Sequence, residues 1–140
     1  MSNNNGAMQT PPTLKFNPEY YTKILCGDKT QTTRLHLKEG IEVGKIVEAK
    51  FNGLEDVILP LIVKKITIKK FFDLNKKDAK REGYLSKANL ELDLMRIYPN
   101  LERDSTIYCI EFYLQEGWIT HEFDIKQNQV HFGGIKKVKL

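Results

Sequence analysis

The sequence predicts an α+β domain in which a mixed, mostly antiparallel sheet curls into a small barrel, with short helices at its ends. Two observations lead to this fold class. The chain has 140 residues and a hydrophobic content of 41%, which is typical of one soluble domain with a substantial core. A helical pattern comes first, followed by several strand patterns, two short helical patterns and strands again, without an internal repeat.

Composition divides the chain into three parts. Residues 1–13 have little to bury and contain paired prolines, so we expect them to form a flexible N-terminal leader. Residues 14–115 are expected to form the main domain. Residues 116–140 are expected to form a C-terminal extension of the same domain, with one strand at 118–125 and a glycine-containing extension at 126–140.

The first helix is predicted from the residues at its two ends. Asn17 is able to cap a helix, Pro18 suits the first helical position, and Glu19 meets the positive end of the helix dipole. Gly27 is able to end the helix in the left-handed conformation. Residues 31–35 follow this turn and contain enough Thr and Leu to form a strand.

Two further strands are predicted in the middle of the chain. Residues 45–51 alternate, and we place Ile46 and Phe51 on their inner face. A strong turn signal, Asn-Gly at 52–53, comes next. Residues 57–71 are rich in Ile and Val, but their apolar positions change parity between Ile62 and Ile66, which indicates a bulge.

Two short helices and a buried strand complete the main domain. Asn75 is able to cap residues 76–82, which Gly83 would end. Ser86 is able to cap the next helix, which Pro99 closes. Its apolar stripe, which we expect to join the core, consists of Leu90, Leu94 and Ile97. Residues 106–114 have the pattern of a strand that is buried on both faces.

The charge is modest in total but unevenly distributed. The net charge is +4, and eight basic residues lie between positions 64 and 81: Lys64, Lys65, Lys69, Lys70, Lys76, Lys77, Lys80 and Arg81. Single lysines are common on solvated faces, where they keep strand edges from pairing. As a group, these lysines make a nucleotide or nucleic-acid partner plausible.

The expected location is the cytoplasm. The longest apolar run, residues 57–63, is interrupted by Pro60, and the N-terminus lacks an apolar signal core, so no contact with a membrane is expected. Cys26 and Cys109 are interpreted as reduced, structural thiols. The three histidines are scattered and the cysteines lack zinc-site spacing, so neither a metal nor another cofactor is expected.

The segment from Gly27 to Arg34 is the strongest candidate for a site. It is a glycine-led turn that carries a lysine, three threonines and an arginine directly after a helix. In a strand, Thr32 and Arg34 share one face and Thr33 lies on the other. A hydroxyl and a guanidinium would therefore project together, with Lys29 close by along the turn.

These residues resemble the ASCH domain family, a branch of the PUA-like superfamily. Residues 27–34 fit its G-x-K-x-x-T-x-R signature, and residues 44–47 resemble the turn and strand that follow. The likeness continues through residues 72–84, then the Leu-rich helix that ends at Tyr98 and Pro99, then residues 107–112. The blocks span some hundred residues in the expected order, and the resemblance implies a PUA-like barrel.

The resemblance implies two kinds of activity. ASCH domains include small amidohydrolases that remove the acetyl group from N4-acetylcytidine, and for these the family's catalytic lysine, threonine and glutamate fall on Lys29, Thr32 and Glu82. They also include non-catalytic modules that bind RNA. The expected partner is thus a nucleoside or RNA, and the residues expected to contact it are Gly27, Arg34, Lys65, Lys69 and Tyr84.

The residue types fit amide hydrolysis, which needs a nucleophile, a base and a proton donor for the leaving amine. Thr32 offers the hydroxyl, and Lys29 would serve as base only with a pKa lowered from its usual value of about 10.4. Glu82 would either donate the proton or hold the lysine. The oxyanion would meet either backbone N–H groups of the turn or Arg34. The plainer alternatives are a solvated Lys29, an ordinary β-forming Thr32, and a salt bridge between Arg34 and Glu82.

Overall fold

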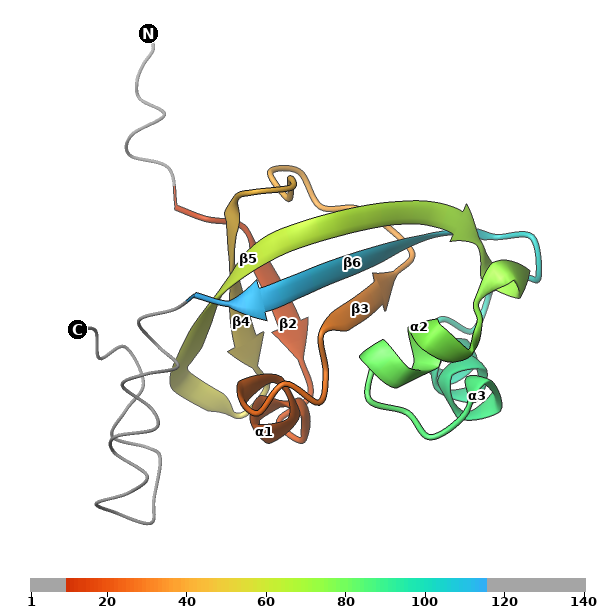
Figure 1. Ribbon diagram of the computed structural model, residues 1–140, viewed down its shortest axis with the longest axis horizontal. Helices are drawn as coiled ribbons and strands as arrows, with labels where there is room; N and C mark the ends of the chain where they lie inside the picture. The colour runs from red at the N-terminus through yellow and green to blue at the C-terminus, as the bar shows by residue number, and fades with distance from the viewer. Residues whose placement is uncertain (1–9, 116–140) are drawn as a thin grey trace, which may run out of the picture.

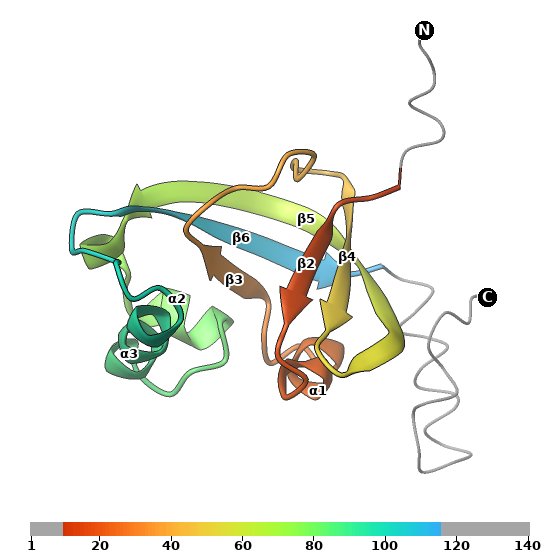
Figure 2. The same ribbon diagram turned by 180° about the vertical axis from the view of Figure 1, so that it is seen from behind.

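The computed structural model describes residues 10–115, which form one curled sheet with three short α-helices (Figure 1, Figure 2). The strands lie in the order β2-β4-β5-β6-β3. In chain order the elements are β2 (Thr13–Phe16), α1 (Tyr20–Leu25), β3 (Gln31–Arg34), β4 (Ile46–Phe51), β5 (Leu54–Lys70), the 3₁₀ helix η1 (Phe71–Asp73), α2 (Lys76–Arg81), α3 (Lys87–Ile97) and β6 (Thr106–Leu114). The expected strand at 118–125 and the extension at 126–140 lie outside the described residues.

The sheet is a mostly antiparallel half-barrel, which confirms the predicted fold class. Among the described strands, only β2 and β4 pair in parallel, and the other three pairings are antiparallel. The long strand β5 curves across the molecule, and the three helices lie on the same side of it, with α1 beside the ends of β2 and β4 and with α2 and α3 near the C-terminal end of β5 (Figure 1, Figure 2). Arg34 bridges β2 and β3, the two edge strands of the sheet, by donating a hydrogen bond to the Lys15 carbonyl at 2.8 Å.

The core has two parts, one on each side of the curled sheet. The barrel interior is filled by side chains that include Phe16, Val47, Leu61, Ile110 and Phe112. The second cluster lies between the sheet and the helices and consists of Phe71, Leu74, Ala79, Leu90, Leu94, Ile107 and Cys109. The strand β6 contributes to both clusters and is buried on both faces over most of its length, although Tyr113 near its end is 50% exposed.

Most of the predicted helix caps, helix ends and strand irregularities are present. Gly27 and Gly83 have positive φ angles of 86° and 89°, as expected for residues that end helices. Asn75 caps α2 in a capping box with Asp78, and Ser86 accepts a hydrogen bond from the Asn89 N–H at the start of α3. The predicted bulge also occurs: opposite β6, the register of β5 shifts between Val63 and Lys65.

Three local predictions are wrong. The buried positions of β4 are Val47, Ala49 and Phe51, so Ile46 lies on the half-buried face, and the small Ala49 had concealed this parity. Ile97 is 51% exposed, because α3 packs through Leu90 and Leu94 and its last turn leaves the core. The Asn17 side chain does not cap α1. Instead, the backbone carbonyl of Asn17 accepts a hydrogen bond from the Tyr20 N–H in the turn before the helix.

No helix within residues 10–115 combines the length and the apolar character that are needed to cross a membrane.

Candidate functional site

A cavity of about 190 Å³ opens beside β3, where β2 and α1 meet the helices α2 and α3. Five of the eight predicted site residues line it: Lys29, Thr32, Arg34, Glu82 and Tyr84. The other three, Gly27, Lys65 and Lys69, are not among its lining residues. The structure therefore brings the candidate catalytic residues together, although their chemical roles stay predictions.

Backbone hydrogen bonds fix the lysine turn. The Lys29 N–H donates to the Lys23 carbonyl at 3.0 Å, and the Thr30 N–H donates to the Arg81 carbonyl at 2.7 Å. The Phe112 N–H in turn donates to the Thr30 carbonyl at 2.9 Å. The turn is thus joined to α1, to the end of α2 and to β6. These bonds also occupy the Lys29 and Thr30 N–H groups, which removes them as oxyanion donors.

Lys29 and Glu82, which both line the cavity, form a buried pair. Their side chains are only 4% and 3% exposed, and Lys29 Nζ lies 3.5 Å from Glu82 Oε1. Lys29 Nζ also donates to the Glu82 backbone carbonyl at 3.2 Å. The same nitrogen lies 4.7 Å from the centre of the Tyr20 ring, within the range of a cation–π interaction.

The surroundings of Lys29 act on its pKa in both directions. Burial is the largest cause that lowers the pKa of Lys29, and the nearby charges of Arg34 and Lys23 lower it further. The charge and hydrogen bonding of Glu82 act in the opposite direction. The balance leaves the pKa below its usual value, as a lysine that acts as a base requires.

Because side chains alternate along β3, Thr32 and Thr33 point to opposite faces and have different partners. Thr32 and Arg34 share one face, as predicted, and Arg34 Nε donates to Thr32 Oγ1 at 3.1 Å. Arg34 also stacks over the Phe16 ring, with 5.0 Å between the guanidinium carbon and the ring centre. Because Arg34 donates to the Thr32 oxygen, the hydroxyl proton of Thr32 is left to point elsewhere.

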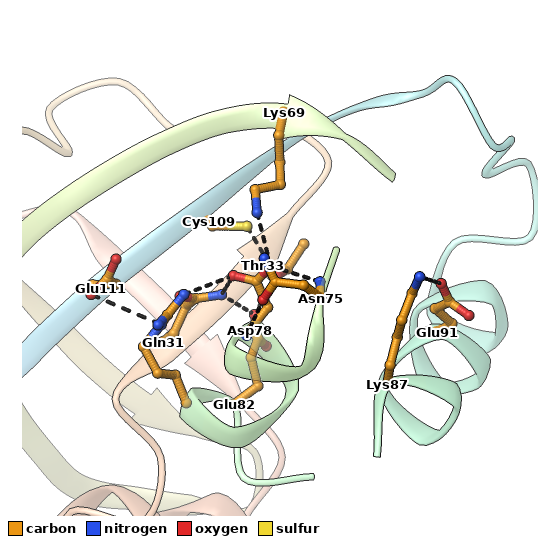
Figure 3. Close-up of polar contacts among 11 residues, drawn as sticks. Gln31, Thr33, Lys69, Asn75, Asp78, Glu82, Lys87, Glu91, Cys109 and Glu111 are labelled. Atoms are coloured by element: carbon orange, nitrogen blue, oxygen red, sulfur yellow. Dashed lines mark hydrogen bonds and ion pairs between the residues drawn. The ribbon is translucent and has the colours of Figure 1, made fainter. Parts of the chain in front are cut away.

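The opposite face of β3 carries two residues that the sequence reasoning had not selected (Figure 3). Gln31 is fully buried, and its Nε2 donates to Glu82 Oε2 at 3.0 Å. Thr33 Oγ1 also donates to Glu82 Oε2. The alternation of the strand was a usable signal, because it places Gln31 and Thr33 together on one face. Their partner, however, lies some fifty positions later in the chain.

A second acidic residue, Asp78, is bonded to the same Gln31 side chain (Figure 3). It accepts hydrogen bonds from Lys69 at 2.8 Å, from Gln31 at 3.2 Å and from Arg81 at 3.0 Å. Burial alone would raise the pKa of Asp78, but the donors, Lys69 foremost, outweigh it, and the pKa is lowered. Lys69 is thus paired with Asp78.

Tyr84 lies at the α3 side of the cavity within a chain of hydroxyl contacts. Its hydroxyl lies 2.8 Å from that of Tyr20 and donates to the Asp93 carboxylate. Burial is the main cause that raises the pKa of Tyr84, and the neighbouring Tyr20 adds to it. Tyr84 is therefore a neutral phenol that is able to pack beside a ligand while its hydroxyl stays bonded.

Within residues 10–115, no group of three His, Cys, Asp or Glu side chains is arranged to hold a metal ion. The chemistry that the cavity offers consists of a nucleophilic hydroxyl, a buried amine of lowered pKa, a carboxylate and a guanidinium. That set suits acyl transfer.

Comparison with solved structures defines the fold class. The chain is similar to the hypothetical protein PH0355, at 19% identity and a TM-score of 0.61, over 76% of this chain and all of that one. It is similar to an ASCH domain from Lactobacillus crispatus at 15% identity and a TM-score of 0.59, over 74% of this chain and 78% of that one. A ZmASCH variant from Zymomonas mobilis matches at 17% identity and a TM-score of 0.55, over 72% and 67% of the two chains.

No family model and no curated protein matches the sequence. The fold is that of ASCH domains.

Proposed function

We propose that the protein is an amidohydrolase that removes an acyl group from N4-acetylcytidine or a related modified nucleoside. The observation that carries this proposal is the buried pair of Lys29 and Glu82 in a cavity that also contains the Thr32 hydroxyl. Burying the charge of a lysine that is only 4% exposed costs free energy, which an ordinary surface lysine does not incur. A buried lysine with a lowered pKa suits a general base.

In the proposed mechanism, neutral Lys29 takes the proton of Thr32 as Thr32 Oγ1 attacks the acyl carbon. The carbon–nitrogen bond then breaks, and the Lys29 ammonium returns this proton to the leaving amine. An acyl ester on Thr32 and the free nucleoside result. Water, activated by Lys29, hydrolyses the ester and releases the carboxylic acid.

Glu82 acts in this mechanism as an anion that orients and stabilises the Lys29 ammonium. Its Oε2 accepts hydrogen bonds from Gln31 and Thr33, so this oxygen acts as an acceptor in the site and not as a proton donor. The role resembles that of the third member of a nucleophile–base–acid triad. We therefore assign the leaving-group proton to Lys29 rather than to Glu82.

Arg34 is the proposed donor to the oxyanion. A guanidinium has five N–H groups, and within residues 10–115 it donates through Nε to Thr32 and through one terminal nitrogen to Lys15. N–H groups therefore remain beside the nucleophile for a developing negative charge.

The alternative, a module that grips RNA phosphates in the same cavity, fits these residues less well. The cavity contains the carboxylates of Glu82 and Asp93, which repel a polyanion. Lys69 is paired with Asp78, and Lys65 is not among the cavity residues. A neutral modified base suits this lining better than a phosphate backbone does.

The nucleophile assignment is tested with Thr32→Val, which removes the hydroxyl at nearly constant volume. We expect turnover of N4-acetylcytidine to fall about a thousandfold or more. In the wild-type protein, rapid quenching followed by peptide mass analysis should find one acetyl group on the peptide that contains Thr32. Full activity of Thr32→Val, or an acetyl group on a peptide without Thr32, would overturn the assignment.

A further inference from the structure

The two carboxylate oxygens of Glu82 are used in different ways. Oε2 accepts hydrogen bonds from Gln31 Nε2 at 3.0 Å and from Thr33 Oγ1. Oε1 lies 3.5 Å from Lys29 Nζ, longer than the usual distance of about 2.7–2.9 Å for a charge-assisted hydrogen bond. The carboxylate is thus held mainly from the side that faces away from the lysine.

The two residues that donate to Glu82 Oε2 are themselves buried, and Gln31 is held by further hydrogen bonds. Gln31 is 0% exposed and Thr33 is 5% exposed, and both project from the same face of β3. The Gln31 amide also donates to Asp78 Oδ1 at 3.2 Å, while its oxygen accepts from Arg81 Nε at 2.7 Å. A flipped amide would place its oxygen against two carboxylates and its nitrogen against a guanidinium.

This arrangement points to a competition for the carboxylate. A buried anion with a single partner pairs tightly with that partner, whereas an anion that already accepts two hydrogen bonds does not need to. We infer that Gln31 and Thr33 are positioning residues, which hold one oxygen of Glu82 and so limit how tightly the other oxygen engages Lys29. The inference rests on the proposed function, in which Lys29 must give up its proton.

The charged and titratable groups around the pair set the direction of the effect. Lys29 is faced by Glu82 at the end of α2, by Arg34 on β3, and by Lys23 and the Tyr20 ring on α1. Glu82 also acts electrostatically on Tyr84 after α2 and on Cys109 in β6, while Asp93 of α3 contacts the site through Tyr84. Of the charges on Lys29, Arg34 and Lys23 favour the neutral amine and Glu82 favours the ammonium. A tighter contact with Glu82 therefore keeps Lys29 protonated.

The test compares Thr33→Val, which loses the donor at nearly constant volume, with Thr33→Ser, which keeps it. In Thr33→Val, we expect the rising limb of the pH–kcat profile to move about one pH unit higher, the equivalent of roughly one lost hydrogen bond to a charged group. Thr33→Ser should restore the wild-type profile. Gln31→Met, a second variant, should move the limb in the same direction.

Leu74→Val is the matched structural control, because Leu74 is 2% exposed and lies in the core beside the helices, away from the cavity lining. This control should lower the melting temperature without moving the limb. If Thr33→Val likewise leaves the limb unmoved, or moves it to lower pH, the positioning role is overturned.

A second readout separates this inference from the proposed function. The Lys29 ammonium is titrated by lysine-selective ¹⁵N NMR in the wild-type protein, Thr33→Val and Thr33→Ser. A midpoint that is higher in Thr33→Val alone supports the positioning role even if no acylated nucleoside is hydrolysed. Equal midpoints overturn it even if the wild-type protein is an active hydrolase.

Discussion

Replacing Glu82 by Gln should destabilise the protein in a way that depends on pH. At the 3.5 Å between Lys29 Nζ and Glu82 Oε1, the Coulomb attraction is about 5 kcal/mol with an effective dielectric constant of 20. The cost of removing both groups from water opposes much of this attraction. Loss of one partner from such a buried pair nevertheless costs about 3–5 kcal/mol, because the remaining charge is left uncompensated.

The pH dependence follows from the direction of the Lys29 pKa. In the folded protein this pKa lies below its value in the unfolded chain, so the unfolded chain binds more protons and stability rises with pH between the two values. Glu82→Gln removes the group that raises the pKa of Lys29, so this pKa falls further in the folded variant. The pH range over which stability rises with pH therefore extends to lower pH. The variant should therefore be much less stable than the wild-type protein at pH 6 and should recover part of the difference by pH 9.

Urea unfolding followed by far-UV circular dichroism measures both effects. At pH 6 we expect Glu82→Gln to lose about 3 kcal/mol of unfolding free energy. Addition of Lys29→Met, which removes the unpaired amine, should restore much of that loss. A deficit of equal size at pH 6 and pH 9, or a double variant less stable than Glu82→Gln, would refute the reasoning.

Two further predictions concern Arg34 and Gly27. Arg34→Lys should lower kcat about tenfold or more and cost about 1–2 kcal/mol of stability, because Arg34 uses two separate nitrogens to donate to Thr32 and to the Lys15 carbonyl, and a lysine has only one. Steady-state kinetics and urea unfolding measure these effects, and unchanged kcat would count against the role of Arg34. Gly27→Ala should cost about 1 kcal/mol through its φ of 86° while leaving KM unchanged, because its added Cβ meets nothing within 4 Å and Gly27 does not line the cavity. An increase of KM in Gly27→Ala would instead support the predicted contact with substrate.

The elements around the site were predictable because local signals define them. Gly27 and Gly83 end helices through positive φ, Asn75 and Ser86 cap the next two helices, and each signal lies within a few residues of its effect. The spacing of Lys29, Thr32 and Arg34 then placed three side chains at the start of one strand.

The partners of these residues were harder to predict, because they come from distant parts of the chain. The sequence shows that Gln31 and Thr33 share a face of β3, but only the packing of α2 against that face brings Glu82 and Asp78 to them. In the same way, Arg34 was expected to face a ligand. Its bond to the Lys15 carbonyl depends on the curl of the sheet, which brings the edge strands β2 and β3 together.

The misplaced residues of β4 and α3 have a simpler cause. Ala49 is small enough to be compatible with either face of a strand, so the alternation of β4 was ambiguous until its pairing with β5 was known. Ile97 continues the helical spacing of Leu90 and Leu94, but it lies in the last turn of α3 and is half exposed. Periodicity identifies a face of an element and does not show how far the neighbouring element extends.

The most direct test of the proposed activity is a time course of N4-acetylcytidine incubated with the wild-type protein and with Lys29→Met, followed by chromatography of the nucleosides. The wild-type protein should release cytidine and acetate in equal amounts, and Lys29→Met should release neither above the rate without protein. Cytidine release by Lys29→Met at the wild-type rate, or no release by the wild-type protein, would contradict the assignment of the buried lysine as a catalytic base.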